Sequence, residues 1–234
     1  MDVVYLVRPG DDNDELRYSL RSLTNLPHDQ VWVSGYRPYW VENVQVIKGN
    51  THPMNSNANV YNNLLRAMEC DEISDQVIVF NDDFYVTEPV TTIKPWYLAT
   101  LAEHYNSPDT SCNPTRTQSL VKTEAVLRDW GVDEPLSFEL HTPFVVDRER
   151  MRDILVRFSI HQPNNPLQAR SLYGNLVDEY ALQHDDVKAY GSGSLNRPFH
   201  STFAGSFPYF RQDLDELFPD PSRYEYSRSM SMSR

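Results

Sequence analysis

The segment 77–80, Val-Ile-Val-Phe, followed at once by Asn81, Asp82 and Asp83, is the feature that most constrains the fold of this chain. Four consecutive apolar residues, three of them β-branched, are typical of a buried central strand. Open α/β sheets bind ligands at the carboxyl ends of their strands, so we expect both acids at that edge. The alternative is a simple cap, in which the carboxylates accept hydrogen bonds from backbone amides of the turn.

The first part of the chain alternates between strand-like and helix-like segments. Strands are expected at 3–7, 30–34, 44–47 and 76–80, and helices at 15–25 and 57–68. Alternation of this kind predicts an α/β fold with a mainly parallel, Rossmann-type sheet and helices on both faces. Beyond residue 90 the pattern loosens into a part made of helices and loops, with helices expected at 96–104, 118–130, 147–158 and 171–184.

Composition excludes several classes of function. The chain carries 21 basic and 33 acidic residues, a formal net charge of −12, which argues against broad binding to nucleic acid or to anionic membranes. The two cysteines, Cys70 and Cys112, are too few for a disulfide framework and are interpreted as free thiols. No segment is apolar enough to span a bilayer and no targeting segment precedes the first strand, so we expect a soluble, cytoplasmic protein. Phosphate-loop, dinucleotide-binding, serine-hydrolase and zinc-protease motifs are absent from the sequence.

Arg8 and the acids that follow it come directly after the first expected strand, at the same predicted edge of the sheet. In one interpretation, Arg8 pairs with a phosphate group and an acid such as Asp12 holds a ribose hydroxyl. In the other, the acids simply begin the next helix, because a short polar residue before a helix caps its free amides. Both interpretations can hold, since different residues would serve each.

Arg17 and Arg21 are four residues apart and therefore share one face of the first helix. Either they form ion pairs with nearby acids, or they bind a diphosphate bidentately. The spacing alone favours the ion-paired, solvent-facing alternative. Asn55 and Asn57 precede or begin the second helix, where amide side chains can cap the helix or hydrogen-bond sugar hydroxyls.

Two histidines have contexts that allow chemistry. His141 lies just before a proline-containing turn, and a histidine there can act as a general base or as a third metal ligand. His200 has the same two possibilities. For each of them the alternative is a packed histidine whose hydrogen bonds are purely structural.

Taken in order, these segments resemble the Stealth family of sugar-phosphate transferases. The resemblance rests on the strings ELRYSLRS at 15–22, NSNA at 55–58, FNDDF at 80–84, HTP at 141–143 and LFPDPSRYE at 217–225. The order of these motifs is kept over nearly the whole chain. The first and third strings are specific enough that chance agreement on both is improbable.

The resemblance implies a glycosyltransferase-A-like domain at 1–223, with a nucleotide-sugar-binding half at 1–90 and an acceptor half at 91–223. The end of the chain, 224–234, is expected to be a disordered tail on its own composition. The resemblance also implies a nucleotide-diphosphate-sugar donor and a divalent metal, Mn²⁺ or Mg²⁺. Mapped onto this chain, it implies Asp82 and Asp83 for the metal and diphosphate, Arg17 and Arg21 as site arginines, Asn55 and Asn57 as donor contacts and His141 for catalysis. With the residues singled out from the sequence itself, the candidate site has three groups: Asp82, Asp83 and His200 for the metal; Arg8, Asp12, Arg21, Asn55, Asn57 and Asn81 for the donor; and Asp83, Arg17, His141 and Asp147 for catalysis.

Two departures from the family leave the reaction open. Phe144 stands where the family's block carries a second histidine, and the long insertions of its larger members are absent. Compact proteins of this kind, many encoded by bacteriophages of actinobacteria, are usually described as glycosyltransferases. We therefore expect a metal-dependent glycosyltransferase of the cytoplasm (the host cytoplasm if phage-encoded), acting on a hydroxyl of a protein, a glycan, a lipid-linked sugar or, least favoured, a modified DNA base. The alternatives are sugar-1-phosphate transfer and a non-catalytic carbohydrate- or nucleotide-binding protein.

Overall fold

A five-stranded sheet in the order β3-β2-β1-β4-β7 forms the centre of the structure. This computed structural model describes residues 1–10, 12–49, 56–161, 167–177, 180–189, 191, 193–203 and 205–226, without the side chains of 56–58. The sheet strands are β1 (Asp2–Val7), β2 (Val31–Gly35), β3 (Gln45–Lys48), β4 (Gln76–Asn81) and β7 (Phe144–Asp147). The first four run parallel, and β7 pairs antiparallel with β4 at the edge.

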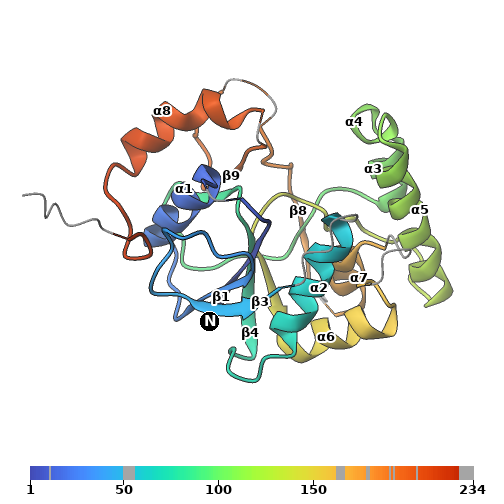
Figure 1. Cartoon of the computed structure of the whole chain (residues 1–234). Coiled ribbons are helices and arrows are strands. Elements are labelled where there is room, and N and C mark those ends of the chain that lie inside the picture. The colour runs from blue at the N-terminus through green and yellow to red at the C-terminus, as the bar shows by residue number, and fades with distance from the viewer. Residues whose placement is uncertain are drawn as a thin grey trace, which may run out of the picture.

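Helices cover both faces of this sheet (Figure 1). One face packs against α1 (Asp14–Ser22), and the other against α2 (Ser56–Met68), α6 (Arg148–Arg157) and α7 (Ala169–Leu176). Successive side chains of a strand point to opposite faces. Accordingly, Tyr5 of β1 packs in the same cluster as Leu16 of α1, whereas its neighbour Leu6 packs in the cluster that contains Leu64 of α2.

The remaining elements surround this core. Two short sheets pair β5 (Phe84–Val86) with β9 (Phe199–Ser201) and β6 (Trp96–Tyr97) with β8 (Leu182–Gln183). The other helices are α3 (Leu101–Asn106), α4 (Pro108–Ser111), α5 (Pro114–Asp129) and α8 (Phe207–Leu217), with a 3₁₀ turn over Leu23–Asn25 after α1. Helix α8 packs on the outer side of α1, where Phe210 and Leu214 contact the cluster around Tyr18.

The α/β class and the mostly parallel, helix-flanked sheet confirm the coarse fold prediction. The four predicted strands and the helices expected at 15–25, 57–68, 118–130 and 147–158 correspond to observed elements. Two expected helices are wrong in part. Segment 96–104 begins as β6 and becomes helical only after Thr100, whose side chain and Glu103 form a capping box that starts α3. Segment 171–184 leaves the helix after Leu176, because residues 182–183 pair with β6 instead.

The predicted domain end at residue 223 is also wrong. Tyr224 and Glu225 are both buried, and Glu225 pairs with Val41 in an isolated antiparallel bridge. The backbone N–H of Tyr226 also donates to Trp40 O at 2.7 Å. Residues 224–226 therefore belong to the packed domain. The rest of the predicted tail, 227–234, and most of the loop residues between β3 and α2 lie outside the described residues.

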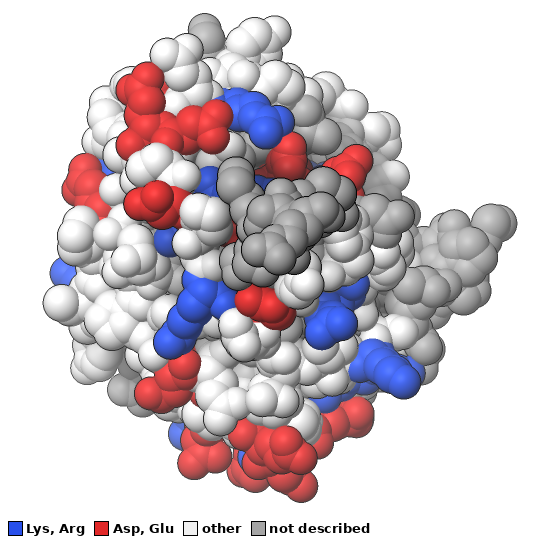
Figure 2. Space-filling model, turned by 60° about the vertical axis from the view of Figure 1, so that its left-hand side comes forward, with Lys and Arg blue, Asp and Glu red and all other residues white. Residues whose placement is uncertain are grey.

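The cysteines, the surface charges and the helices can be compared with what the composition predicted. Cys70 and Cys112 are free, as expected. On the face shown in Figure 2, acidic and basic side chains are interspersed, and the basic ones form no continuous surface among the residues drawn there. Within the part of the chain that the structure describes, no helix combines the length and apolar character needed to cross a membrane.

Candidate functional site

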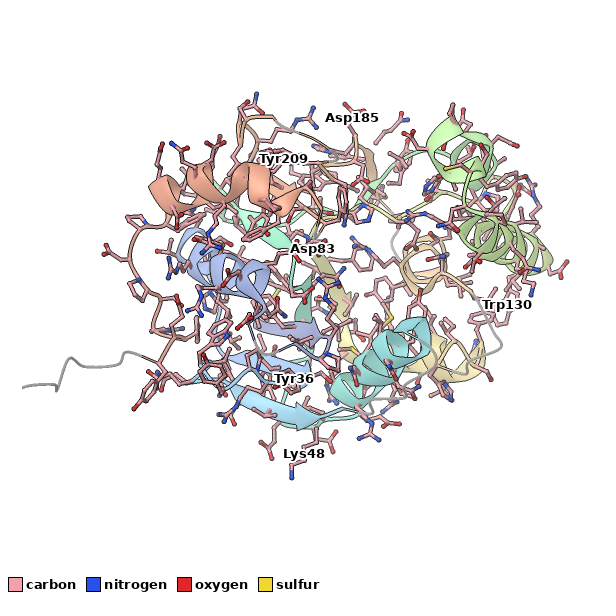
Figure 3. The ribbon with its side chains drawn as sticks, turned by 45° about the horizontal axis from the view of Figure 1, so that its top comes forward. Tyr36, Lys48, Asp83, Trp130, Asp185 and Tyr209 are labelled. Atoms are coloured by element: carbon pink, nitrogen blue, oxygen red, sulfur yellow. The ribbon has the colours of Figure 1, made fainter. Side chains whose placement is uncertain are left out.

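The strand order reverses between β1 and β4, and this is where open α/β sheets bind their ligands, outside the carboxyl ends of the strands. A cavity of about 370 Å³ lies at this point. Its lining comes from the ends of β1, β2 and β4 and from α2, and includes Arg8, Tyr36, Asn63, Asn81, Asp82 and Asp83. In Figure 3, Asp83 lies near the middle of the molecule and above Tyr36, which follows β2. We call the cavity of about 370 Å³ the switch-point cavity.

Asp82 and Asp83 occupy the turn that joins β4 to β5, and both are largely withdrawn from solvent. Asp82 accepts a hydrogen bond from Asn13 Nδ2 at 3.0 Å, and the Arg8 Nε atom lies 3.6 Å from its Oδ2. Arg8 also donates to Glu15 Oε2 at 3.0 Å, so one arginine bridges two acids. Because the Arg8 side chain is 63% exposed, it reaches these acids from the solvent side.

Segments far along the chain complete the same cluster. Lys188 Nζ donates to Asp83 Oδ2 at 2.8 Å, and Ser201 Oγ donates to the same oxygen at 3.0 Å. Thr202 Oγ1 donates to Glu15 Oε1 at 2.9 Å. Three carboxylates, contributed by the β4–β5 turn and by α1, thus meet two cations and two hydroxyl groups.

The surroundings of Asp82 and Glu15 disfavour the ionised form of these acids. Burial raises the pKa of Asp82, and the neighbouring charge of Asp83 adds to that effect, whereas Arg8 and Asn13 oppose it. Burial also raises the pKa of Glu15, with Asp83 and Asp82 acting in the same direction. Desolvation and like charge both disfavour the ionised form, so an added cation would be stabilised at this position.

A second cavity, of about 170 Å³, adjoins the first. Both are lined by Leu6, Val60 and Asn81, and the second is also lined by His141. We call it the histidine cavity. His141 Nδ1 donates to Asp186 Oδ2 at 2.7 Å, and Asp186 Oδ1 accepts from the backbone N–H of His141 at 2.8 Å. This pair fixes the orientation of the imidazole ring, as a carboxylate commonly does for a working histidine.

The charge of Asp186 is predicted to stabilise the fold in a pH-dependent way. Burial alone would raise its pKa, but the hydrogen bonds and charge of His141 outweigh burial and lower the pKa from 3.8 to about 2. A lowered carboxyl pKa gives stability that is fully present above the unfolded value and is lost as the pH falls through the folded one. We expect Asp186→Asn to reduce the free energy of unfolding by roughly 2 kcal/mol at pH 6, since each pKa unit is worth about 1.4 kcal/mol.

Urea unfolding at several pH values between 6 and 2 would check this expectation. The difference between wild type and Asp186→Asn should shrink steadily below about pH 4. Asp185→Asn is the matched control, because Asp185 is the neighbouring acid and is exposed. A difference that stays constant down to pH 2 would mean that Asp186 acts through packing and not through its charge.

Arg17 and Arg21 do not line either cavity. Arg17 Nη1 lies 2.7 Å from Glu225 Oε2, and its guanidinium stacks 4.1 Å from the Trp40 ring. Arg21 Nε donates to Glu225 Oε1 at 2.8 Å. The ion pairs that the spacing favoured are therefore present, but they do not face solvent, since the side chains of Arg21 and Glu225 are 12% and 3% exposed. The placement implied by the family resemblance is not observed among the residues that line the two cavities.

Asp147 lies at the wrong end of the sheet for catalysis beside Asp83. It pairs with Gln76, the first residue of β4, whereas the acids follow the last residue of that strand. Its side chain accepts from the backbone N–H of Arg150 at 2.9 Å and so caps α6. The assignment of Asp147 to the catalytic group is corrected to a helix cap.

His200 is a structural histidine and not a ligand of a metal at Asp82 and Asp83. On β9 it alternates with Ser201, whose side chain contacts Asp83, so the two side chains point to opposite sides of the strand. Its Nε2 accepts a hydrogen bond from the backbone N–H of Arg197 at 3.1 Å. Burial, with the nearby charge of Arg197, lowers the pKa of His200 to about 4.

The remaining donor-site predictions have mixed outcomes. Asn81 and Arg8 line the switch-point cavity, whereas the exposed Asp12 does not, and its carbonyl accepts from Trp40 Nε1 at 3.1 Å. The cap of α1 is Asn13, whose Oδ1 accepts from Leu16 N at 3.2 Å. Asn55 and the side chain of Asn57 lie outside the described residues. The residues of the site that the sequence did not predict are Glu15, Asn63, Asp186, Lys188 and Ser201; of these, Asn63 has a local signal, because it shares a helix face with Asn59 at a spacing of four.

Comparison of the chain with models of known protein families and with curated proteins found no match. The two adjoining cavities bring together four acids, four cations and an oriented histidine, and this arrangement suits a ligand that carries both a diphosphate and hydroxyl groups.

Proposed function

We propose that the protein is a metal-dependent glycosyltransferase with a glycosyltransferase-A-like fold, which moves a sugar from a nucleotide-diphosphate sugar to an acceptor hydroxyl. One observation carries the proposal. Asp82 and Asp83 follow the carboxyl end of β4, beside the end of β1, in a cavity of about 370 Å³ where the strand order reverses. An acidic pair at that position suits the binding of a cation together with a diphosphate.

The residues present fit a divalent metal. Mg²⁺ and Mn²⁺ prefer oxygen ligands and commonly take one or two protein carboxylates, leaving other positions to phosphate and water. Asp82 and Asp83 are the candidates, and among the described residues no three histidines, cysteines or acids form a complete cage. When bound, the metal would neutralise charge on the departing nucleoside diphosphate.

The cations of the cluster serve the same ligand in this proposal. Arg8 and Lys188 each pair with an acid of the cluster, and each can donate to a phosphate oxygen when the donor binds. Arg8 is exposed enough to move with the ligand, while Lys188 is held deeper in the cavity. Stabilisation of charge as it develops on the leaving group is the largest contribution such residues make to catalysis.

His141 is proposed as the general base. Because its Nδ1 donates to Asp186, Nε2 is the ring atom left to accept a proton from an acceptor hydroxyl. In this proposal the acceptor binds next to the donor's sugar; the shared lining of the two cavities at Asn81 supports that arrangement. Asp186 is then a positioning residue, acting through the imidazole.

Thermal unfolding in the presence of candidate donors tests the proposal. UDP-, GDP-, ADP-, TDP- and CMP-sugars would be compared with Mn²⁺, Mg²⁺ or EDTA, on wild type, on Asp83→Asn and on the control Asp185→Asn. A donor at about a hundred times its Kd should add roughly 2.7 kcal/mol of stability. We expect one nucleotide to give a metal-dependent shift that Asp83→Asn loses and Asp185→Asn keeps.

Two other outcomes would count against the proposal. If no nucleotide sugar shifts the unfolding temperature, the switch-point cavity is not a donor site. If a donor binds tightly but no acceptor, water included, is ever glycosylated, the protein is a carbohydrate- or nucleotide-binding module.

A further inference from the structure

Two arginines line the histidine cavity together with His141. Arg116, from the first turn of α5, and Arg170, from the first turn of α7, both line the histidine cavity. Among the described residues, neither guanidinium forms an ion pair within 4.0 Å or a hydrogen bond. The proposed glycosyl transfer assigns no role to either residue.

Arg170 is the more unusual of the two. Its guanidinium stacks 4.7 Å from the centre of the Phe144 ring, and its buried Nε atom has no hydrogen-bond partner in the described part of the chain. Burial lowers its pKa, which is the expected penalty for a desolvated charge. Such a charge is costly unless an anion pairs with it.

The acid with the largest favourable effect on Arg170 does not remove this cost. Glu139 also lines the cavity, and its charge favours the charged form of Arg170. However, Glu139 Oε1 accepts hydrogen bonds from the backbone N–H and the hydroxyl of Ser171, at 3.0 and 2.9 Å. Its carboxylate is held by α7 and forms no ion pair with Arg170 within 4.0 Å.

We propose that Arg116 and Arg170 form an anion subsite, which binds a phosphate or carboxylate group carried by the acceptor. This inference rests on the proposed function, because the proposed function is what identifies the molecule bound here as the acceptor. The switch-point cavity has cations of its own, Arg8 and Lys188, for the donor's diphosphate. An anion held in the histidine cavity would instead fix the acceptor, with its hydroxyl beside His141.

A purely structural role for Arg170 makes a different prediction. If the guanidinium serves only to stack on Phe144, then Arg170→Met should lower the unfolding temperature and phosphate should have no specific effect. If the charge is kept for an anion, Arg170→Met should raise the unfolding temperature of the ligand-free protein, because a buried charge is replaced by an apolar side chain.

Inorganic phosphate is the probe, titrated without nucleotide or metal at constant ionic strength while thermal unfolding is followed. The variants are Arg170→Met, Arg170→Lys and Arg116→Met. Arg157→Met is the matched control, because Arg157 also stacks on an aromatic ring, 5.3 Å from Trp130, but lies outside both cavities. We expect at least a tenfold weaker phosphate affinity in Arg170→Met and Arg116→Met, partial retention in Arg170→Lys and no change in Arg157→Met.

Equal phosphate shifts in wild type and in all variants, or no shift in any, would overturn the subsite. Should Arg170→Met fail to fold, Arg116→Met decides the outcome.

A second experiment repeats the phosphate titration in the presence of the nucleoside diphosphate that the donor screen selects. If the two ligands raise the unfolding temperature additively, the anion belongs to the acceptor. If they compete, the subsite binds the donor's own phosphate and the acceptor assignment is overturned. Phosphate binding that depends on Arg170 while no nucleotide binds would retain the subsite and remove the proposed function.

Discussion

Replacement of Asp83 by asparagine is expected to lower turnover by a factor of about 10² to 10³ or more while the protein stays folded. The side chain is 13% exposed and accepts from Ser201 and Lys188 at one oxygen, so asparagine keeps the shape and an oxygen that can accept these bonds but loses the charge. A loss of roughly 3–4 kcal/mol of barrier stabilisation is typical when one group that stabilises developing charge is removed.

The assay needs no knowledge of the acceptor. Release of nucleoside diphosphate, from the donor that the screen selects, can be followed with water as a slow acceptor, with and without EDTA. Circular dichroism of each variant reports whether the fold is intact, and Asp185→Asn should retain wild-type rates. Wild-type turnover by Asp83→Asn would remove the metal and diphosphate assignment. With a true acceptor, a product mass that retains one phosphate would indicate sugar-1-phosphate transfer in place of glycosyl transfer.

The sequence was most informative where one physical cause acts over a short segment. The buried run of residues 77–80 forms β4 and places Asp82 and Asp83 at the ligand-binding edge, because a parallel strand buried on both faces needs consecutive apolar residues. Strand β7 was missed for the opposite reason. It has four residues, runs directly into the cap of α6 and pairs at the edge of the sheet, so its pattern merges with the helix that follows.

The second half of the site was not predictable from local pattern. Lys188 and Asp83 are 105 residues apart, and Asp186 and His141 are 45 residues apart. Residues 184–188 belong to no helix or long strand, so no periodicity marks them. The tertiary contacts that bring this segment to the edge of the sheet depend on β9 and on the packing of the histidine cavity, which only the whole fold specifies.

Arg17 and Arg21 illustrate how a motif can be structural and not catalytic. The family resemblance implied that both reach the donor, whereas their charges are used by Glu225, near the other end of the chain. The sequence analysis placed Glu225 in a disordered tail, so the acid that satisfies both arginines was excluded from consideration. An ion pair that joins α1 to the end of the domain is invisible to spacing rules, which compare residues of one element only.

Glu225→Gln is therefore expected to destabilise the protein by about 3–5 kcal/mol, the usual cost of leaving buried charges without their partner. The Glu225 side chain is 3% exposed, accepts from Arg17 at 2.7 Å and from Arg21 at 2.8 and 2.9 Å, and also accepts from the backbone N–H of Ser222 at 2.8 Å. Glutamine preserves the size of the side chain, so the loss would report on charge. Glu216→Gln is the matched control, because Glu216 lies exposed on α8.

The pH dependence of this effect separates charge from packing. Burial alone would raise the pKa of Glu225, but hydrogen bonds from Arg21, Ser222 and Arg17 outweigh burial and lower the pKa below its ordinary 4.5. The stabilisation is then fully present above that value and is lost as the pH falls through the folded pKa. Urea unfolding should therefore give a large difference between wild type and Glu225→Gln at pH 7 and a smaller one at pH 3. If Glu225→Gln is as stable as wild type, Glu225 does not hold the two arginines. The end of the chain would then be disordered, as the sequence predicted, and both arginines could bind the donor.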